Sequence, residues 1–131
     1  MDEKLSEIDD QCDLVVLPGG IPGVPNLKTN SKVQAMVKAQ NDRGGYVAAI
    51  CAGPTALGAF GVLADKNATC YPGCEDQLMA KRHSTEPVVV DGNMITSRGV
   101  GTAIEFALKL VEILIDRQTA DDLAEKIVYK R

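Results

Sequence analysis

Short apolar runs alternate with amphipathic segments along the chain. Residues 14–17 (LVVL) and 46–50 (YVAAI) are apolar without alternation, which predicts strands buried on both faces of a parallel sheet. Residues 67–71 predict a shorter strand, and residues 88–96 predict a β-hairpin that turns at Asp91-Gly92. Predicted strands therefore recur through most of the sequence.

The segments between these strands carry helical and loop signals. Residues 18–26 (PGGIPGVPN) predict a loop, and residues 74–81 predict a helical turn. Pro54 suits the first turn of a helix over residues 54–60. Residues 31–43 predict a helix that ends at Gly44-Gly45 and buries the face formed by Val33, Met36, Val37 and Gln40.

Two further helices are predicted near the C-terminus. Residues 102–116 give the strongest signal, because Thr102 and Glu105 form a capping-box pattern and many apolar residues share one face. Thr119 and Asp122 predict the start of a last helix that runs to about residue 128. The apolar face of the first helix comprises Ile104, Leu108, Val111 and Ile115, widened by Phe106, Leu110 and Leu114.

Strands that alternate with helices predict an α/β sandwich of three layers around a mainly parallel sheet. The length suits a single domain over residues 1–131. In such a fold, ligands bind beyond the carboxyl ends of the strands. Three turns reach that edge of the predicted sheet, at residues 18–20, 51–53 and 97–102.

Composition narrows the classes of function. Apolar residues make up 45% and charged residues 24%, and the formal net charge of −4 disfavours binding to nucleic acid or to an acidic membrane surface. No apolar run approaches the roughly 20 residues of a membrane span, and no signal peptide is visible. We therefore expect a cytoplasmic protein whose four cysteines remain thiols.

Cys51 is the sharpest chemical feature of the sequence. It lies between a predicted buried strand and a predicted helix, with Ala49 two residues before it and Gly53 two residues after it. This spacing matches a nucleophile elbow, in which small neighbours permit the sharp turn that exposes the nucleophile. A buried structural cysteine is the competing interpretation.

Backbone donors flank this cysteine in the predicted fold. The N–H groups of Gly19, Gly20 and Ala52 are placed to form an oxyanion hole, whereas Gly19-Gly20 taken alone is more simply an ordinary strand-exit turn. Residues 97–102 (SRGVGT) lack the lysine of a Walker motif and the spacing of a dinucleotide fingerprint, so we exclude nucleotide binding. They form either an anion-binding wall beside Cys51 or a plain helix-entry loop.

The other nucleophilic or metal-ligating residues give weaker signals. His83 is the only histidine, and although a Cys–His pair can activate a thiol, its charged surroundings (KRHSTE) predict a solvated side chain. Cys70 and Cys74 have C-x3-C spacing without a second pair of ligands, so we expect ordinary thiols and no metal site. Cys12 carries no signal.

Several segments together resemble one known family. Residues 14–20 (LVVLPGG), 48–57 (AAICAGPTAL), 96–102 (TSRGVGT) and 105–108 (EFAL) are similar to the ThiJ/PfpI superfamily, in particular to its branch of Parkinson-disease protein 7, ThiJ and YajL. The resemblance covers most of the chain. It implies a flavodoxin-like fold of the class I glutamine amidotransferase type, a homodimer and a site without a cofactor.

The resemblance also implies a chemistry. Cys51 matches the family's nucleophilic, oxidisable cysteine, and the implied activities are glyoxalase III chemistry, which converts methylglyoxal to lactate, and deglycation of glyoxal adducts. Sensing of oxidative stress or chaperone activity is the alternative. Ala52 stands where peptidase relatives have a histidine, which disfavours protease activity. Gly20 and Ala52 match the backbone donors, and the implied pocket wall comprises Pro54, Tyr71, Ser97 and Arg98.

Two features depart from the family's pattern. Tyr71 stands where the human-type branch has a histidine, so we expect no Cys–His dyad. The family's glutamate, which hydrogen-bonds the cysteine, comes from a first strand–helix section that this sequence lacks. We therefore expect weak or no turnover unless another chain or segment supplies the acid, and a truncated product without independent activity is a further alternative.

Overall fold

The computed structural model describes residues 13–19, 26 and 28–130. The main sheet has four strands: β1 (Leu14–Leu17), β2 (Tyr46–Ile50), β5 (Val88–Asp91) and β6 (Met94–Ser97). Their order is β1-β2-β6-β5, and all neighbours are parallel except the hairpin of β5 and β6. A small parallel pair, β3 (Asn67–Ala68) and β4 (Arg82–His83), lies beside the main sheet.

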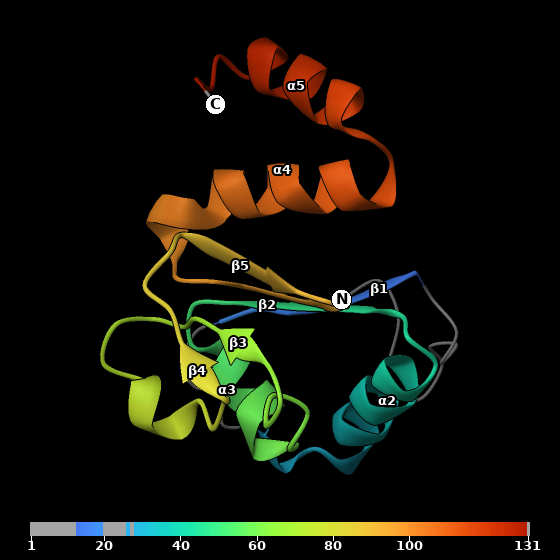
Figure 1. Ribbon diagram of the computed structural model, residues 1–131, viewed down its shortest axis with the longest axis vertical. Helices are drawn as coiled ribbons and strands as arrows, with labels where there is room; N and C mark the ends of the chain where they lie inside the picture. Colours follow the sequence, from blue (N-terminus) through green and yellow to red (C-terminus); the bar gives the residue numbers. More distant parts are fainter. Residues whose placement is uncertain (1–12, 20–25, 27, 131) are drawn as a thin grey trace.

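Helices cover both faces of this sheet (Figure 1). On one face lie α2 (Ser31–Asp42) and α3 (Gly53–Ala59), and on the other lies α4 (Ala103–Leu114), which carries α5 (Arg117–Lys126) on its outer side. Single 3-10 turns, η2 (Glu75–Gln77) and η3 (Val100–Thr102), complete the described elements. The predicted three-layer sandwich with a mainly parallel sheet is confirmed.

Each face of the sheet has its own apolar core. The face under α2 and α3 buries a large cluster that includes Val37, Val47 and Leu57, whereas the face under α4 buries Ala48, Ile95 and Phe106. The predicted buried face of α2 is confirmed, including Gln40, whose side-chain amide donates a hydrogen bond to the Tyr46 carbonyl at 3.1 Å. That bond satisfies a buried polar group.

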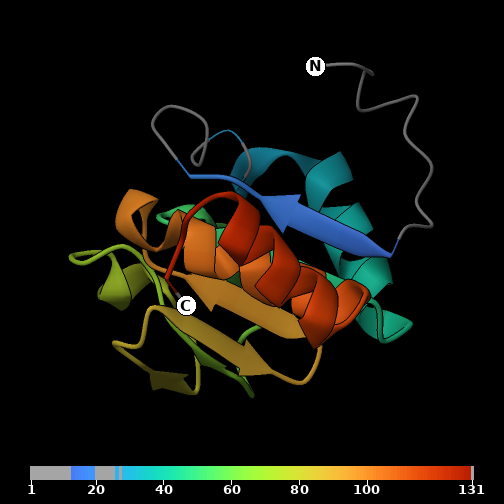
Figure 2. The ribbon, with the colours of Figure 1, turned by 90° about the horizontal axis from the view of Figure 1, so that it is seen from above.

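Two predictions about strands are wrong in part. β1 is not buried on both faces: it lies at the edge of the main sheet, and Val16 is 42% exposed (Figure 2). The predicted strand over residues 67–71 ends at Ala68, because the Thr69 N–H binds the Thr96 hydroxyl instead of a strand partner. β4 was not predicted, because both of its side chains are exposed and it carries no apolar signal.

Predictions about the C-terminal helices also need correction. The Thr102 hydroxyl does not cap α4 but binds the loop that precedes it, so the predicted capping box does not form. α4 buries Phe106 and Leu108, while Ile104 and Ile115 are exposed. The last helix begins at Arg117 rather than Thr119, with Asp116 as its N-cap. None of the described helices is long and apolar enough to cross a membrane.

Candidate active site around Cys51

Cys51 occupies a strained turn between β2 and α3. Its φ angle is +63°, in the left-handed region that few residues other than glycine adopt. The small neighbours are required by packing: a Cβ atom on Gly53 would lie 2.6 Å from the Leu17 carbonyl oxygen. This geometry matches the nucleophile elbow that the sequence predicts, because strain of this kind persists where the surrounding structure enforces it.

Hydrogen bonds hold the Cys51 backbone between two other segments. Its N–H donates to the Ser97 carbonyl at the end of β6 (3.1 Å), and its carbonyl accepts from the Tyr71 N–H (2.8 Å). The side chain is half-buried, and the sulfur has no hydrogen-bond partner among the described residues. The turns after β2 and β6 therefore meet at one edge of the sheet, as predicted.

The turn after β1 lies directly against the thiol. A Cβ atom on Gly19 would stand 2.6 Å from the Cys51 Cβ and 3.2 Å from its Sγ, so only glycine fits there. Ala52 is the N-cap of α3, and its N–H makes no hydrogen bond to the described residues. Gly19 and Ala52 thus lie beside Cys51, whereas Gly20 falls outside the described residues.

The residues of the predicted pocket wall differ in their accessibility. Tyr71 is half-exposed, and its ring lies next to Gly99. Arg98 is half-buried and donates from Nε to the Cys70 carbonyl at 3.3 Å. Pro54 and Ser97 are buried, and the Ser97 hydroxyl binds the Pro87 carbonyl and the Thr102 hydroxyl, both at 2.7 Å. Ser97 therefore meets Cys51 through its carbonyl rather than its side chain.

Thr102 has a role that was not predicted: it closes the loop that carries Arg98. Its hydroxyl accepts a hydrogen bond from the Gly99 N–H at 3.0 Å and also bonds Ser97, which fixes the loop that carries Arg98. The signal was available in the sequence, since a hydroxyl residue three positions after a glycine is suited to close a short loop onto itself.

The other thiols and the histidine lie in different surroundings. Cys70 is fully buried, and burial above all, followed by the negative charge of Glu75, raises the pKa of its thiol to about 11. Cys74 is half-buried, and His83 is exposed on β4 without a hydrogen bond to Cys51. The described residues contain no group of three or more His, Cys, Asp or Glu side chains that could hold a metal ion.

Comparison with known proteins decides the family. The profile of the DJ-1/PfpI family matches residues 1–113. The chain belongs to this family. It is 45% identical over 121 residues to the Parkinson disease protein 7 homolog of Danio rerio. The aligned residues are 90% of this chain and 64% of that relative. The chain thus spans less than two thirds of that protein's length.

Two further relatives extend this comparison to structure and activity. The structure of oxidised DJ-1 from Toxoplasma gondii superimposes with a TM-score of 0.86 at 34% identity, over 97% of this chain and 68% of that one. A glutathione-independent glyoxalase of Caenorhabditis elegans is 37% identical over 117 residues, which are 88% of this chain and 62% of the relative. The flavodoxin-like fold implied by the sequence resemblance is consistent with these similarities.

Proposed function

We propose that this DJ-1/PfpI chain contributes the nucleophile of a glutathione-independent glyoxalase or deglycase. The observation that supports this proposal most strongly is the Cys51 elbow, where a cysteine with φ +63° faces a turn that admits only glycine. The relative from Caenorhabditis elegans, which is itself a glutathione-independent glyoxalase, supports the reaction class. The substrate is a small dicarbonyl such as methylglyoxal, or its adduct.

The proposed reaction needs no external oxidant. The Cys51 sulfur attacks the aldehyde carbon of methylglyoxal to give a hemithioacetal, and backbone N–H groups of Gly19, Gly20 and Ala52 stabilise the oxygen. A proton then moves from the former aldehyde carbon to the neighbouring carbon, which oxidises the first and reduces the second and leaves a thioester. Water releases lactate and restores the thiol, so methylglyoxal and one water give one lactic acid.

The proton transfer between carbons needs a general acid–base group. No described side chain makes a hydrogen bond to the Cys51 sulfur. The test is lactate formation from methylglyoxal by the chain and by Cys51→Ser, with Cys74→Ser as the matched control. We expect the chain and the control to form lactate at the same weak rate, and Cys51→Ser to form none. Equal activity in all three would contradict a role for Cys51.

Oxidation of Cys51 is the second candidate function. The Toxoplasma gondii relative has been solved in an oxidised form, which supports a redox response in this family. Peroxide converts a thiolate to a sulfenate and water, and a second peroxide gives a sulfinate. After brief peroxide treatment, peptide mass mapping should find oxidation concentrated at Cys51. Oxidation spread evenly over Cys12, Cys51, Cys70 and Cys74 would contradict this candidate.

A further inference from the structure

Arg98 bridges the two segments that hold Cys51. Residue 97, its neighbour, accepts the Cys51 N–H, while the Arg98 Nε donates to the Cys70 carbonyl at 3.3 Å. The next residue, Tyr71, donates to the Cys51 carbonyl at 2.8 Å. Because the Cys70 carbonyl and the Tyr71 N–H belong to one peptide group, the Arg98 Nε lies within about 8 Å of the Cys51 carbonyl oxygen.

The outer end of this guanidinium is not neutralised. The hydrogen bond from Nε to the Cys70 carbonyl holds the side chain of Arg98 in place. The two Nη atoms have no hydrogen-bond or ion-pair partner among the described residues. An arginine in this state offers the planar pair of donors that carboxylates and phosphates accept. The separation of the Arg98 Nε from the Cys51 carbonyl oxygen is comparable to the Debye length of about 8 Å at physiological ionic strength, so screening does not remove the field of Arg98 at the Cys51 turn.

One carboxylate nearby opposes this charge. Glu75 is half-buried and accepts a hydrogen bond from the Gly73 N–H at 2.8 Å. Its own backbone N–H above all, and then Gly73, His83 and Arg98, lower the pKa of Glu75, so it is ionised at neutral pH. Its carboxylate is nevertheless beyond ion-pair distance of Arg98 in the described part of the chain. Glu75 therefore weakens the field of Arg98 without binding its guanidinium.

We propose that Arg98 selects aldehydes that carry an anionic group, a carboxylate or a phosphate, and holds that group while Cys51 attacks the carbonyl. This inference rests on the proposed function for its reaction, but it concerns recognition and is tested apart from turnover.

The first test compares two alkylating agents that differ in charge. Iodoacetate and iodoacetamide react with the same thiolate, so the ratio of their rate constants at Cys51 reports charge recognition and cancels changes in thiol reactivity. We expect Arg98→Gln to lower the iodoacetate-to-iodoacetamide ratio about threefold to tenfold, Arg98→Lys to lower it less, and Glu75→Gln to raise it. Arg82→Gln, which removes an exposed arginine on β4, should leave it unchanged.

Gln retains a donor for the Cys70 carbonyl, and circular dichroism of each variant establishes that it is folded. A ratio that is equal in the unmodified chain and in folded Arg98→Gln would overturn the proposal. An equal fall in Arg82→Gln would also overturn it, because the effect would then be one of net charge.

The second test identifies the anion and separates this proposal from the proposed function. Glyoxylate, glyceraldehyde 3-phosphate and neutral methylglyoxal compete with iodoacetamide for Cys51. We expect one or both anionic aldehydes to protect at lower concentration than methylglyoxal, with the advantage lost in Arg98→Gln; which of them protects distinguishes carboxylate from phosphate. Protection without lactate formation would contradict only the glyoxalase proposal. Lactate formation with no Arg98-dependent preference would contradict only the selection of anions.

Discussion

At the scale of single residues, the site depends on Gly19, which has no side chain to collide with Cys51. Gly19→Ala would place a Cβ 3.2 Å from the Cys51 Sγ and 2.6 Å from its Cβ, so the thiol or the turn after β1 must shift. A displacement of about 1 Å at a reacting group can cost roughly a hundredfold in rate. We expect Gly19→Ala to slow iodoacetamide labelling of Cys51 and lactate formation at least tenfold.

Gly101→Ala is the matched control for that change, because nothing lies within 4 Å of a Cβ at Gly101. It should react like the unmodified chain. If Gly19→Ala labelled as fast as Gly101→Ala while both were folded, the close contact at Cys51 would have no consequence for reactivity.

The buried thiol of Cys70 gives a second prediction at this scale. Its pKa rises from the ordinary value of 9.0 to about 11 in the folded chain, chiefly by burial and then by Glu75. The folded state therefore holds the thiol proton more tightly than the unfolded state. Its contribution to stability is complete below pH 9.0 and is lost as the pH rises through about 11.

The measurement is urea denaturation between pH 8.5 and 11. We expect Cys70→Ala to flatten the fall in the free energy of unfolding over this range, and Cys74→Ala, at a half-exposed position, to leave the fall as it is. Labelling at neutral pH should find Cys70 unmodified until the chain unfolds. Equal labelling of Cys70 and Cys51 in the folded chain would contradict this account.

At the scale of elements, α3 is tightly packed below the site. A Cβ on Gly58 would lie 2.1 Å from the Leu78 carbonyl oxygen. Alanine favours a helix over glycine by about 1 kcal/mol, but overpacking against fixed backbone costs about 1–3 kcal/mol. We expect the cost of overpacking to exceed the gain in helix propensity, because a backbone oxygen cannot rotate away. We expect Gly58→Ala to lower the midpoint of thermal unfolding, whereas a rise would show that the segment around Leu78 yields easily.

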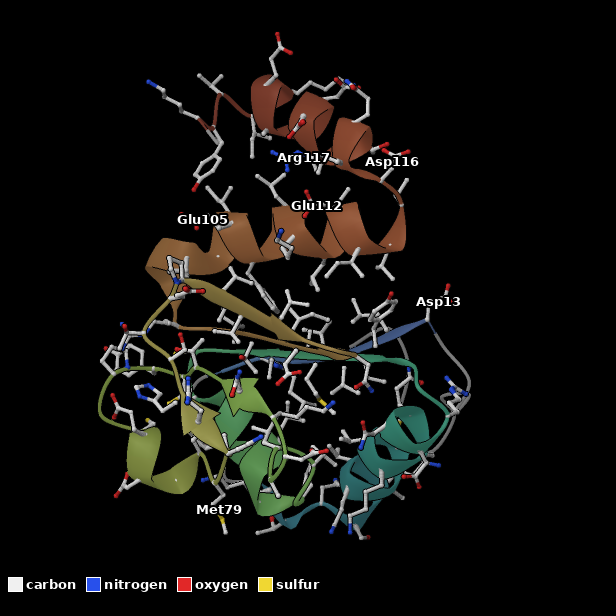
Figure 3. The ribbon with its side chains drawn as sticks, in the orientation of Figure 1. Asp13, Met79, Glu105, Glu112, Asp116 and Arg117 are labelled. Atoms are coloured by element: carbon white, nitrogen blue, oxygen red, sulfur yellow. The ribbon has the colours of Figure 1, made fainter. Side chains whose placement is uncertain are left out.

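The start of α5 rests on a single capping residue. The Asp116 carboxylate accepts a hydrogen bond from the Thr119 N–H at 2.7 Å, and Figure 3 shows Asp116 where the chain enters this helix. We expect Asp116→Ala to lower the melting temperature by a few degrees, while Glu125→Ala, which removes the same charge from the helix surface, has little effect.

The pH dependence of that cap has a definite sign. The Thr119 N–H lowers the pKa of Asp116 below its ordinary value of 3.8. The stabilisation is therefore present above pH 3.8 and is lost as the pH falls through the folded-state pKa. The difference in melting temperature between Asp116→Ala and the unmodified chain should become smaller at acid pH. A difference that grows there would contradict the role of the Asp116 carboxylate as the cap.

The elements that could be predicted from sequence are those whose signal is local. The apolar run of β2 and the face of α2 at Val33 and Val37 are visible in the order of residues, and so is the elbow at Cys51. β4 has two exposed polar residues and exists only because β3 lies beside it. The bond from Arg98 to the Cys70 carbonyl joins residues 28 positions apart, so no local pattern indicates it.

At the scale of the whole molecule, the two edges of the main sheet differ. The edge strand β5 contacts β3, and the Asp91 carboxylate accepts the Asn67 N–H at 2.8 Å. Among the described residues, β1 pairs only with β2. Val16 on β1 is 42% exposed, and an edge strand that presents apolar side chains can pair with another chain. We therefore expect association between copies of this chain to use β1.

Val16→Lys tests this expectation, because a lysine on an edge strand opposes further strand pairing. Sedimentation over a range of concentrations should show weaker association for Val16→Lys than for the unmodified chain. Val90→Lys is the matched control, because Val90 is 45% exposed on the other edge strand, β5, which already contacts β3. This substitution should leave association unchanged. An equal loss in both variants would indicate an effect of charge alone, and no loss in either would place the contact between copies elsewhere on the surface.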